Sequence, residues 1–355
     1  MPEISIIIPN YNTAKYLPRC LDSLIHQTFR DIEIIVIDDG STDNSLEILK
    51  GYQDHRIRIL SHQGDGSGPG GARNMGLQSA HGKYIMFCDS DDWYEPNMCQ
   101  KMYETIEQKK VDLVCCQSYL EDEEGLSQKE LEGRHKYQYY NALPDGKLIL
   151  TDKRILKTNV LLWNKIWRRD LIKKYQISLI SKIEHEDDAF WLMYGSVAST
   201  IYYLKDKLYH YFLRRNSIMS AVFHKTPKNP TDRYQVCLAV YTFLNKNNLL
   251  NQHKEFIIYV FRNQLRVMGQ FLPEDQLKKY CESLNKIIKN DLKSNKYLVV
   301  SADMVSLFDR CDKIKLWYQL CVSYFKKHLY SYIKKKKCKK YEKKIQQLKI
   351  MLKSI

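Results

Sequence analysis

The sequence lacks the patterns that mark zinc-binding, membrane-spanning or secreted proteins. Its ten cysteines include no Cys-x-x-Cys pair and no cluster with histidine, so we expect no zinc site. No apolar run approaches the ~20 residues that cross a bilayer, so we expect no transmembrane helix. The N-terminal Met1-Pro2-Glu3 leads directly into a strand-like run, which indicates no signal peptide. Together these absences predict a cytoplasmic protein.

Excess positive charge is small over most of the chain and is concentrated at its C-terminal end. The net charge is +15, yet residues 326–355 alone hold twelve lysines and one glutamate. Because the remainder is only mildly basic, binding of nucleic acid across the surface is not expected. The C-terminal lysines instead favour a different polyanionic partner.

The Lys-rich tail, residues 326–355, also carries one apolar stripe. After the basic run Lys334–Lys340, apolar residues recur at alternating spacings of four and three, namely Tyr341, Ile345, Leu348, Leu352 and Ile355. This pattern is typical of an interfacial helix and predicts attachment to the anionic inner face of the plasma membrane. A solvated basic helix and a short coiled coil between protomers are the alternatives.

What the chain does have is a hydrophobic fraction of 44% in 355 residues, enough for one large or two ordinary domains. Short apolar runs alternate with helical patterns at 4–8, 33–37, 57–60, 84–88 and 111–116. This alternation predicts an α/β fold with a mainly parallel, doubly wound sheet. Cys88, Cys115 and Cys116 lie in these runs and are expected to be buried thiols. After about residue 225 the periodicity predicts a helical extension.

Polar residues follow three of these runs at the point where each predicted strand ends. The three segments are Pro9-Asn10-Tyr11-Asn12, Asp38-Asp39-Gly40-Ser41 and Asp89-Ser90-Asp91-Asp92. Since ligands bind where the carboxyl ends of parallel strands meet, these segments predict a cleft at one edge of the sheet. Solvated polar turns are the alternative interpretation of each segment taken alone.

The third segment has the spacing of a cation site. Asp89 and Asp91 are one residue apart, and side chains alternate along an extended chain, so both are expected to point toward one site. Two carboxylates at close range repel each other unless water or a metal lies between them. Mg²⁺ or Mn²⁺ suits such a pair and bridges to phosphates.

The first two segments offer groups that fit a nucleotide. Pro9 and Tyr11 can frame a flat base, and Asn12 can offer it an amide. Asp38 or Asp39 can accept a hydrogen bond from a base N–H or a ribose hydroxyl. A turn followed by a helix cap is the alternative for the second segment.

A glycine-rich stretch, Gly68-Pro69-Gly70-Gly71, opens a predicted helix that carries Arg73. The start of a helix favours anions, and an arginine just inside it can hold a phosphate. We therefore include Arg73 among the candidate donor-binding residues, although a lone glycine-rich loop is a weak signal.

Taken together, these segments resemble the family-2 inverting glycosyltransferases with the GT-A fold, the bacterial type that builds capsular polysaccharide, exopolysaccharide or lipopolysaccharide. The resemblance is strong over residues 3–117. It is carried by four motifs in this order: Ser5–Asn12, Ile37–Asp43, Gly71–Gly76 and Asp89–Trp93. It continues more weakly through Trp163–Arg169, Glu186–Phe190 and Tyr209–Ile218, and has no counterpart for residues 225–355.

The resemblance implies a nucleoside-diphosphate sugar donor, expected to be UDP-linked, and a lipid-linked or growing saccharide as acceptor. It implies a divalent cation on Asp89 and Asp91, and donor contacts that include Ser90. By position it implies Asp187 as the catalytic base, although the neighbouring Asp188 leaves that assignment ambiguous. The implied acceptor side is formed by Trp163, Lys165 and Glu186, with core packing as an equal alternative for Trp163.

The expected organisation is a GT-A-like domain over residues 1–222, a helical extension over 223–325 and the Lys-rich tail over 326–355. Within the first domain, residues 1–117 would bind the nucleotide and residues 118–222 the acceptor. A sugar-1-phosphate nucleotidyltransferase is disfavoured, because that class has a basic, glycine-rich loop where this chain has Pro9–Asn12. A non-catalytic, sugar-nucleotide-binding assembly protein of the same fold is the alternative function.

Overall fold

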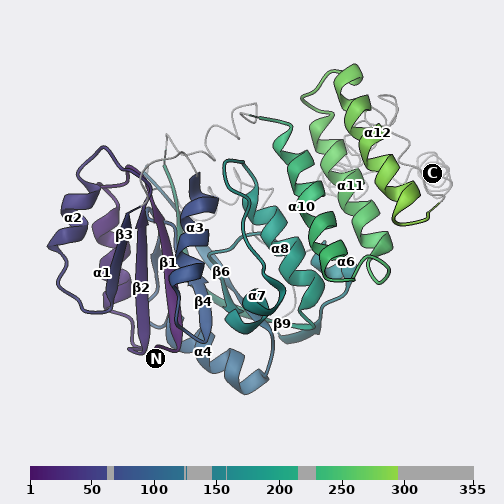
Figure 1. Ribbon diagram of the computed structural model, residues 1–355. Coiled ribbons are helices and arrows are strands. Elements are labelled where there is room, and N and C mark those ends of the chain that lie inside the picture. The colour runs from purple at the N-terminus through teal and green to yellow at the C-terminus, as the bar shows by residue number, and fades with distance from the viewer. Residues whose placement is uncertain (62–67, 124, 126–145, 157, 215–228, 295–355) are drawn as a thin grey trace, which may run out of the picture. The chain divides into compact units, whose positions relative to one another are not determined.

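A computed structural model describes residues 1–61, 68–123, 125, 146–156, 158–214 and 229–294, all within one compact unit, Met1–Leu298 (Figure 1). A second unit, Val299–Ile355, contains the whole Lys-rich tail and lies outside the described residues. The same holds for most of the 118–150 part of the predicted acceptor region and for Arg215–Ile218. The predicted division into domains stays a prediction.

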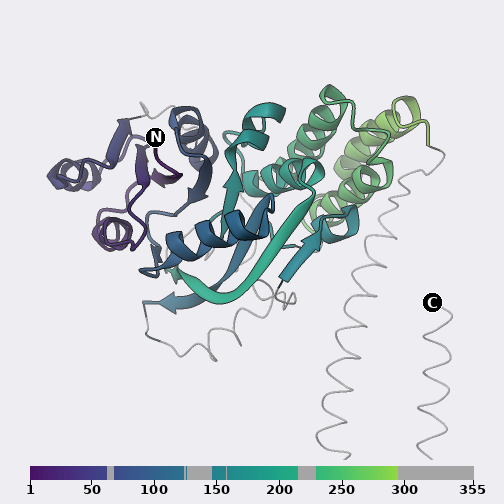
Figure 2. The ribbon, with the colours of Figure 1, turned by 90° about the horizontal axis from the view of Figure 1, so that it is seen from below.

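The strands form one mixed sheet. Their bounds are β1 Ile4–Asn10, β2 Ile32–Asp38, β3 Ile57–Ser61, β4 Tyr84–Phe87, β5 Trp93–Tyr94, β6 Leu113–Asp122, β7 Gly146–Ile149, β8 Lys165–Arg168 and β9 Thr200–Leu213. The order across the sheet is β3-β2-β1-β4-β8-β6-β9-β5, with β7 paired to β9 off this path. The long strand β9 bends strongly along its length (Figure 2).

Strand direction bears out the expected fold class. Strands β1 to β4 pair in parallel, and β8 is antiparallel to both β4 and β6, so β6 returns to the direction of β4. Strand β9 is parallel to β6, whereas β5 and β7 are antiparallel to β9. Six of the nine strands in the described part of the chain therefore run in one direction. The α/β, mainly parallel prediction is confirmed, and the antiparallel strands follow residue 90.

The helices cover both faces of this sheet and continue beyond it. Their bounds are α1 Leu17–Ile25, α2 Ser45–Gly51, α3 Gly68–Ser79, α4 Met98–Lys109, α6 Asp152–Ile155, α7 Arg169–Tyr175, α8 Glu186–Val197, α10 Asp232–Lys246, α11 Lys254–Met268 and α12 Glu274–Asn290. None of the described helices is long and apolar enough to cross a membrane.

Strand β1 explains why helices lie on both faces. Its even-numbered side chains, Ile4, Ile6 and Ile8, join a buried cluster with apolar residues of α1 and α4. On the opposite face, a Cβ added to Gly76 of α3 would lie 2.4 Å from Cγ2 of Ile7. A continuous apolar run is therefore buried from both sides, as expected for a central parallel strand, and only glycine permits this approach of α3.

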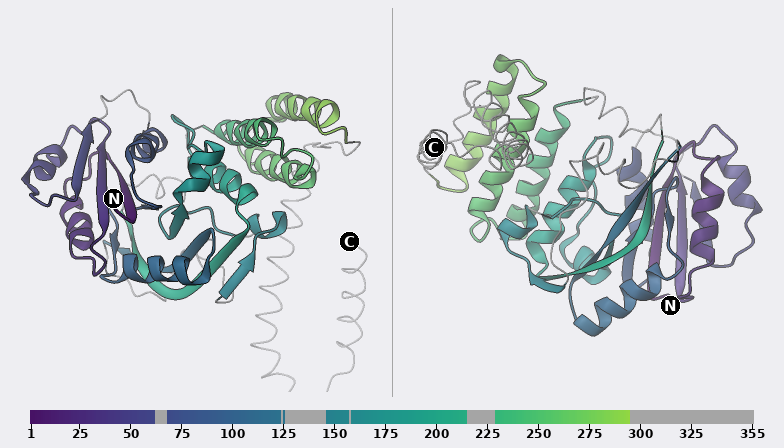
Figure 3. Two further views of the ribbon diagram at one scale, coloured as in Figure 1. Left: turned by 60° about the horizontal axis from the view of Figure 1, so that its bottom comes forward. Right: turned by 180° about the vertical axis from the view of Figure 1, so that it is seen from behind.

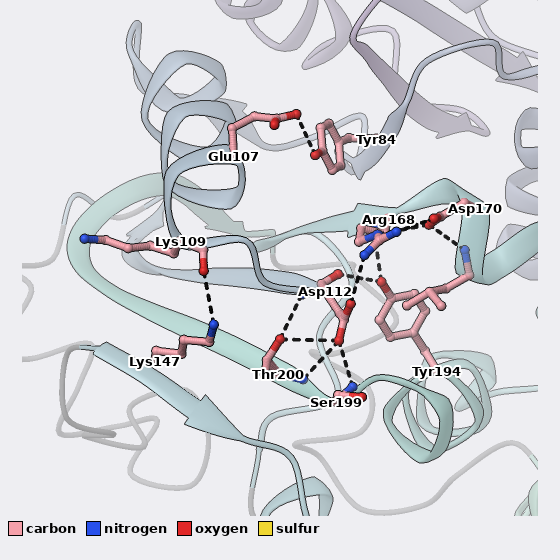
Figure 4. A network of polar contacts seen from close by, with 11 residues as sticks. Tyr84, Glu107, Lys109, Asp112, Lys147, Arg168, Asp170, Tyr194, Ser199 and Thr200 are labelled. Atoms are coloured by element: carbon pink, nitrogen blue, oxygen red, sulfur yellow. Dashed lines mark hydrogen bonds and ion pairs between the residues drawn. The ribbon is translucent and has the colours of Figure 1, made fainter.

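A single residue, Asp112, joins the second half of the sheet to α8 through its carboxylate and its backbone carbonyl oxygen (Figure 4). Its Oδ2 accepts hydrogen bonds from the backbone nitrogens of Ser199 and Thr200 at 2.8 and 3.1 Å. Its Oδ1 lies 3.3 Å from Nη1 of Arg168, and Tyr194 donates to its carbonyl oxygen at 2.6 Å. The starts of β6 and β9, the end of β8 and the last turn of α8 are fixed together by these contacts.

The described helices of the extension, α10, α11 and α12, belong to the same compact unit. Helices α10 and α11 contact each other, α11 contacts α12, and α10 packs on α8 (Figure 3). His253 Nδ1 lies 2.7 Å from Oδ1 of Asp152, which links the start of α11 to α6. The expectation that residues after 225 are helical is confirmed as far as residue 290.

The seven cysteines in the described residues are all free and buried. Burial raises the pKa of the Cys88, Cys115 and Cys116 thiols, which favours the uncharged form. The prediction of buried thiols within apolar strands is confirmed for these three.

Candidate functional site

Polar groups gather where β1 and β2 end, as the sequence predicts. Asn10 pairs with Asp38 in the sheet register, and the backbone nitrogen of Asp39 donates to the carbonyl oxygen of Asn10 at 2.9 Å. The ends of these neighbouring parallel strands therefore lie side by side at the carboxyl edge of the sheet.

The two acids after β2 have different environments. Oδ1 of Asp38 accepts from Asn10 Nδ2 at 2.7 Å and from the Ser41 hydroxyl at 2.5 Å, while its Oδ2 accepts from the Ser41 backbone at 3.1 Å. Asp38 is 1% exposed, so its carboxylate supports the turn. Asp39 is half-buried, and the Tyr11 ring is 57% exposed, so these two can be reached by a ligand.

Asn12 shapes the same edge through its backbone and its amide. It adopts φ +51°, a left-handed conformation that asparagine tolerates better than most residues. Its Oδ1 accepts a hydrogen bond from the backbone nitrogen of Thr42 at 2.8 Å. The Thr13 hydroxyl lies 2.6 Å from Asn10 Oδ1 and 2.9 Å from Ser90 Oγ. The segments after β1, β2 and β4 are thereby joined, and Ser90 is buried within this network.

The acidic segment after β4 is a turn rather than an extended strand end. The backbone nitrogen of Asp92 donates to the carbonyl oxygen of Asp89 at 3.0 Å, which closes the turn. The argument that Asp89 and Asp91 share a direction because extended side chains alternate is therefore wrong. Each acid of this turn takes a different partner: Arg73 for Asp89, Arg214 for Asp91, and Tyr209 for Asp92.

Arg73 joins two of the predicted site segments. Its Nη2 donates to Asp89 Oδ1 and its Nη1 donates to Glu186 Oε1, each at 2.7 Å. Burial lowers the pKa of the Arg73 guanidinium, but the Asp89 and Glu186 carboxylates more than offset this, so the pKa is raised. The guanidinium is thus a fixed positive charge between β4 and α8, and its buried Nε has no hydrogen-bond partner among the described residues.

The residues around Arg73 explain how α3 reaches that position. A Cβ on Gly70 would lie 2.3 Å from the carbonyl oxygen of Ile180, so only glycine permits this approach. Asn74 Nδ2 donates to the carbonyl oxygen of Leu179, and the Leu179 nitrogen donates back to Asn74 Oδ1, both at 2.8 Å. The segment that precedes α8 is therefore held against α3.

Asp187 occupies the first turn of α8, beside Glu186. Burial raises its pKa well above the usual range, and the negative charges of Asp188 and Glu186 raise it further, with Arg73 opposing them. A carboxylate with a raised pKa is a stronger base, as a proton acceptor requires. The neighbouring Asp188 has its own partners, because its Oδ2 lies 3.4 Å from Nη1 of Arg233.

Asp91 is half-buried and Asp92 is fully buried. Burial raises the pKa of Asp91 and repulsion by Asp89 adds to it, while Arg214, whose Nε lies 2.6 Å from Asp91 Oδ2, opposes the rise. Asp92 is fully buried, and its carboxylate accepts from the Tyr209 hydroxyl at 2.5 Å and from the Phe212 backbone at 2.7 Å. Asp92 therefore fixes the turn to β9.

The predicted acceptor residues Trp163 and Lys165 are buried. Trp163 stacks on Tyr209 with ring centroids 4.2 Å apart and belongs to the apolar cluster, which favours the core-packing alternative. Lys165 is 0% exposed, and its Nζ donates to Asn159 Oδ1, to Asn164 Oδ1 and to the carbonyl oxygen of Leu161. Burial lowers the pKa of Lys165 to about 8. Neither side chain presents a surface for an acceptor in this arrangement.

Two carboxylates, those of Asp89 and Asp91, are the structure's candidates for a cation. Within the described ranges, no group of three or more histidine, cysteine, aspartate or glutamate side chains is arranged to hold a metal. Oxygen ligands at two positions nevertheless fit Mg²⁺ or Mn²⁺, which commonly take further ligands from substrate phosphates and water. The repulsion between Asp89 and Asp91 is also the kind that a cation relieves.

A cavity of about 500 Å³ lies elsewhere, beside the start of β4 and the end of β8. Its lining includes Tyr84, Glu107, Arg168 and Asp170, which Figure 4 labels, and none of the predicted site residues. The candidate site is therefore the edge built by Arg73, Asp89 and the start of α8.

Several residues of this edge were missed by the sequence argument. Arg214 lies in a stretch that resembles the family, but nothing local indicates Asp91 as its partner. Asp92 was read only as part of the acidic segment, although a third consecutive acid is a signal that one of them is buried and paired. The Arg233 contact with Asp188 has no local sequence signal.

The sheet and the site at its carboxyl edge define the class of protein, which is one with the GT-A fold of glycosyltransferases. The crystal structure of S. aureus TarS 1-349 in complex with UDP-GlcNAc is similar, with a TM-score of 0.58 and 20% identity. The match covers 85% of this chain and 95% of that chain. At this level of identity the likeness concerns the fold alone.

Sequence similarity gives the family. The family model described as Glycosyl transferase family 2 matches residues 5–175. EpsH of Bacillus subtilis (strain 168), a glycosyltransferase by name, is 33% identical over 265 residues, which make up 72% of each chain. Glycosyltransferase GlyG of Streptococcus pneumoniae serotype 4 is 34% identical over 243 residues, 62% of this chain and 74% of GlyG. The protein belongs to glycosyl transferase family 2, as its motifs predict.

Proposed function

We propose that the protein is an inverting glycosyltransferase of cell-surface polysaccharide synthesis. It would move a sugar from a nucleoside-diphosphate donor to a hydroxyl of a growing or lipid-linked saccharide. The observation that carries this proposal is the pair of hydrogen bonds from Arg73 to two carboxylates, called the Arg73 fork below. One joins it to Asp89 on the donor side, and the other joins it to Glu186, next to the candidate base Asp187. The likeness to TarS, whose crystal structure contains UDP-GlcNAc, supports UDP as the nucleotide.

The donor nucleotide would lie along the ends of β1 and β2. Asp39 is the preferred partner for the base or ribose, because it is half-buried, whereas Asp38 is fully engaged and keeps the turn in place. The exposed ring of Tyr11, with Pro9 beside it, would frame the base. Asn12 and Ser90 would act by holding these segments rather than by touching the nucleotide.

Asp89 and Asp91 would hold Mn²⁺ or Mg²⁺ against the donor diphosphate, with Asp91 as the preferred direct ligand. The cation would stabilise the charge that develops on the departing nucleotide. Arg73 already neutralises one oxygen of Asp89, so it adds a second positive charge near the same phosphates. These residues bind and orient the leaving group.

Asp187 would take the proton from the acceptor hydroxyl as that oxygen attacks the anomeric carbon. One displacement breaks the bond to the diphosphate, forms the new glycosidic bond and inverts the anomeric centre. A general base contributes ~10²–10⁴-fold in rate. Glu186 would orient this end of α8 through Arg73, and the buried Trp163 and Lys165 would shape the wall behind the acceptor.

A panel of nucleotide sugars tests the proposal with the full chain. We expect Mn²⁺-dependent release of UDP, lost in Asp91→Ala and in Asp187→Asn. Release that neither substitution affects would overturn the mechanism. Binding of a UDP-sugar without any release or transfer across the panel would support the alternative, a non-catalytic assembly protein.

We also propose that the Lys-rich tail attaches the enzyme to the inner face of the plasma membrane, where a lipid-linked acceptor would be found. The proposal rests on sequence alone. Each lysine near an anionic surface is worth ~1 kcal/mol. Co-sedimentation with anionic vesicles should fall when Lys334–Lys337 are changed to glutamine in the full chain, and neutral vesicles serve as the control. Equal binding by both proteins would reject the anchor.

A further inference from the structure

Two side chains of the helical extension engage Asp188, the acid next to the proposed base. Arg233 of α10 places Nη1 3.4 Å from Asp188 Oδ2 and donates to Gln264 Oε1 of α11 at 2.8 Å. Nε2 of Gln264 lies 3.4 Å from the same Asp188 oxygen. Gln264 is buried, and the Arg233 and Asp188 side chains are only 18% and 16% exposed, so water screens this cluster weakly.

Helix α10 also contacts the chain just before Asp187. Arg233 Nη2 lies 3.2 Å from Nε2 of His185, and the Asp232 carboxylate accepts from the Glu184 nitrogen at 2.8 Å. His185 adopts φ +70°, a left-handed conformation that is uncommon for residues other than glycine and persists when its surroundings hold it. The extension thus contacts the chain both before and after Asp187, at His185 and at Asp188.

Resting on the proposed role of Asp187, we propose that Arg233 is a positioning residue for the transfer reaction. It fixes the first turn of α8 and neutralises Asp188, so that Asp187 is left as the acid that accepts the proton. This gives the described helices of the extension a part in catalysis.

The charges around Asp187 determine how the loss of Arg233 would change the pKa of Asp187. Asp187 is affected by Glu186 and Asp188 on its own helix, by Arg73 of α3 and by Lys165 of β8. Burial and the charge of Arg233 lower the pKa of His185, while Asp188, Glu184 and Asp232 oppose this. Asp188 is among the charges that raise the pKa of Asp187. Without Arg233, Asp188 repels more strongly, and the pKa of Asp187 rises further.

The test is the pH dependence of kcat/KM for sugar transfer, measured on full-length variants. The acidic limb is the fall of kcat/KM at low pH, where the base becomes protonated. Its midpoint should rise by ~1 pH unit in Arg233→Gln, which corresponds to a ~10-fold loss of kcat/KM at pH values below the midpoint. It should move down in Asp188→Asn, which keeps the shape of the side chain and removes its charge. Arg233→Lys should restore most of the wild-type profile. Arg262→Gln removes the same charge from an exposed position of α11 and should leave the profile unchanged.

The double variant Arg233→Gln/Asp188→Asn tests whether Arg233 acts on Asp187 through Asp188. Since the effect of Arg233 passes through Asp188, the acidic limb of the double variant should coincide with that of Asp188→Asn alone. A limb that Arg233→Gln does not move, or moves equally with and without Asp188, overturns the inference while leaving the proposed function intact. If Asp187→Asn retains transfer, the proposed function fails first and the inference fails with it.

Discussion

Nη2 of Arg73 lies 2.7 Å from Oδ1 of Asp89, and this ion pair joins the second turn of α3 to the turn after β4. Through its other nitrogen the same guanidinium holds Glu186 at the start of α8. The planar guanidinium gives each carboxylate its own nitrogen, whereas a lysine would offer both of them a single nitrogen. The donor side and the base side of the site are therefore connected by one residue.

Loss of Arg73 should destabilise the protein strongly. Arg73→Ala would leave Asp89 and Glu186 without their counter-charge, and we expect the free energy of unfolding to fall by about 3–5 kcal/mol. Arg73→Lys should cost less, because it keeps the charge but loses the arrangement of two nitrogens on two carboxylates. Urea denaturation at pH 7 measures both. Arg262→Ala, at an exposed position, is the control and should change the free energy of unfolding by no more than about 0.5 kcal/mol. An equally small change in Arg73→Ala would contradict the stabilising role of the Arg73 ion pairs.

Asp187→Asn should lose activity and gain stability. Because the folded pKa of Asp187 is raised, its favourable contribution is full below the unfolded value near ~3.9 and is lost as pH rises through the folded value. Asparagine can still accept the Asp188 backbone hydrogen bond that now measures 3.0 Å, so the fold should be kept. Thermal midpoints at pH 8 should be higher for the variant, and the difference should vanish near pH 4. A lower midpoint at pH 8 would refute the electrostatic account.

Gly70 should tolerate no side chain. In Gly70→Ala the new Cβ would meet the Ile180 carbonyl oxygen, 2.3 Å away, and push α3 from the segment before α8. We expect a loss of stability of about 1–3 kcal/mol from overpacking. We also expect a loss of ~10²-fold in kcat/KM, because the Arg73 fork would be displaced. Gly51→Ala, in a helix with nothing within 4 Å, is the matched control and should be neutral.

Removal of divalent cations should stop UDP release, and added Mn²⁺ should restore it. Asp91→Asn should raise the Mn²⁺ concentration needed for half-maximal release by ~10–100-fold. The same substitution at the exposed Asp275 of α12 should leave that concentration unchanged. Full release in the presence of a chelator would exclude the cation role given to Asp89 and Asp91.

The sequence located β1, β2, β3, β4 and β6 because consecutive apolar residues such as Ile6-Ile7-Ile8 are a local signal of a strand buried on both faces, whereas it located none of β5, β7, β8 and β9. It located the acids at the strand ends for the same reason, since they stand directly after those runs. Its argument for a shared direction of Asp89 and Asp91 was wrong, because a turn replaces the extended backbone there. It also could not show that Lys165 is fully enclosed, since enclosure depends on the segments that pack around it.

By itself the sequence determined the α/β class, the mainly parallel character of the sheet and the family, because these follow from periodicity and from motifs of neighbouring residues. Only the tertiary structure decided which partner each acid takes. Arg73 and Glu186 are separated by 113 residues, and Arg233 and Asp188 by 45. A short-range pattern carries no information about such pairs, because the chain must fold before their charges come within a few ångströms of each other.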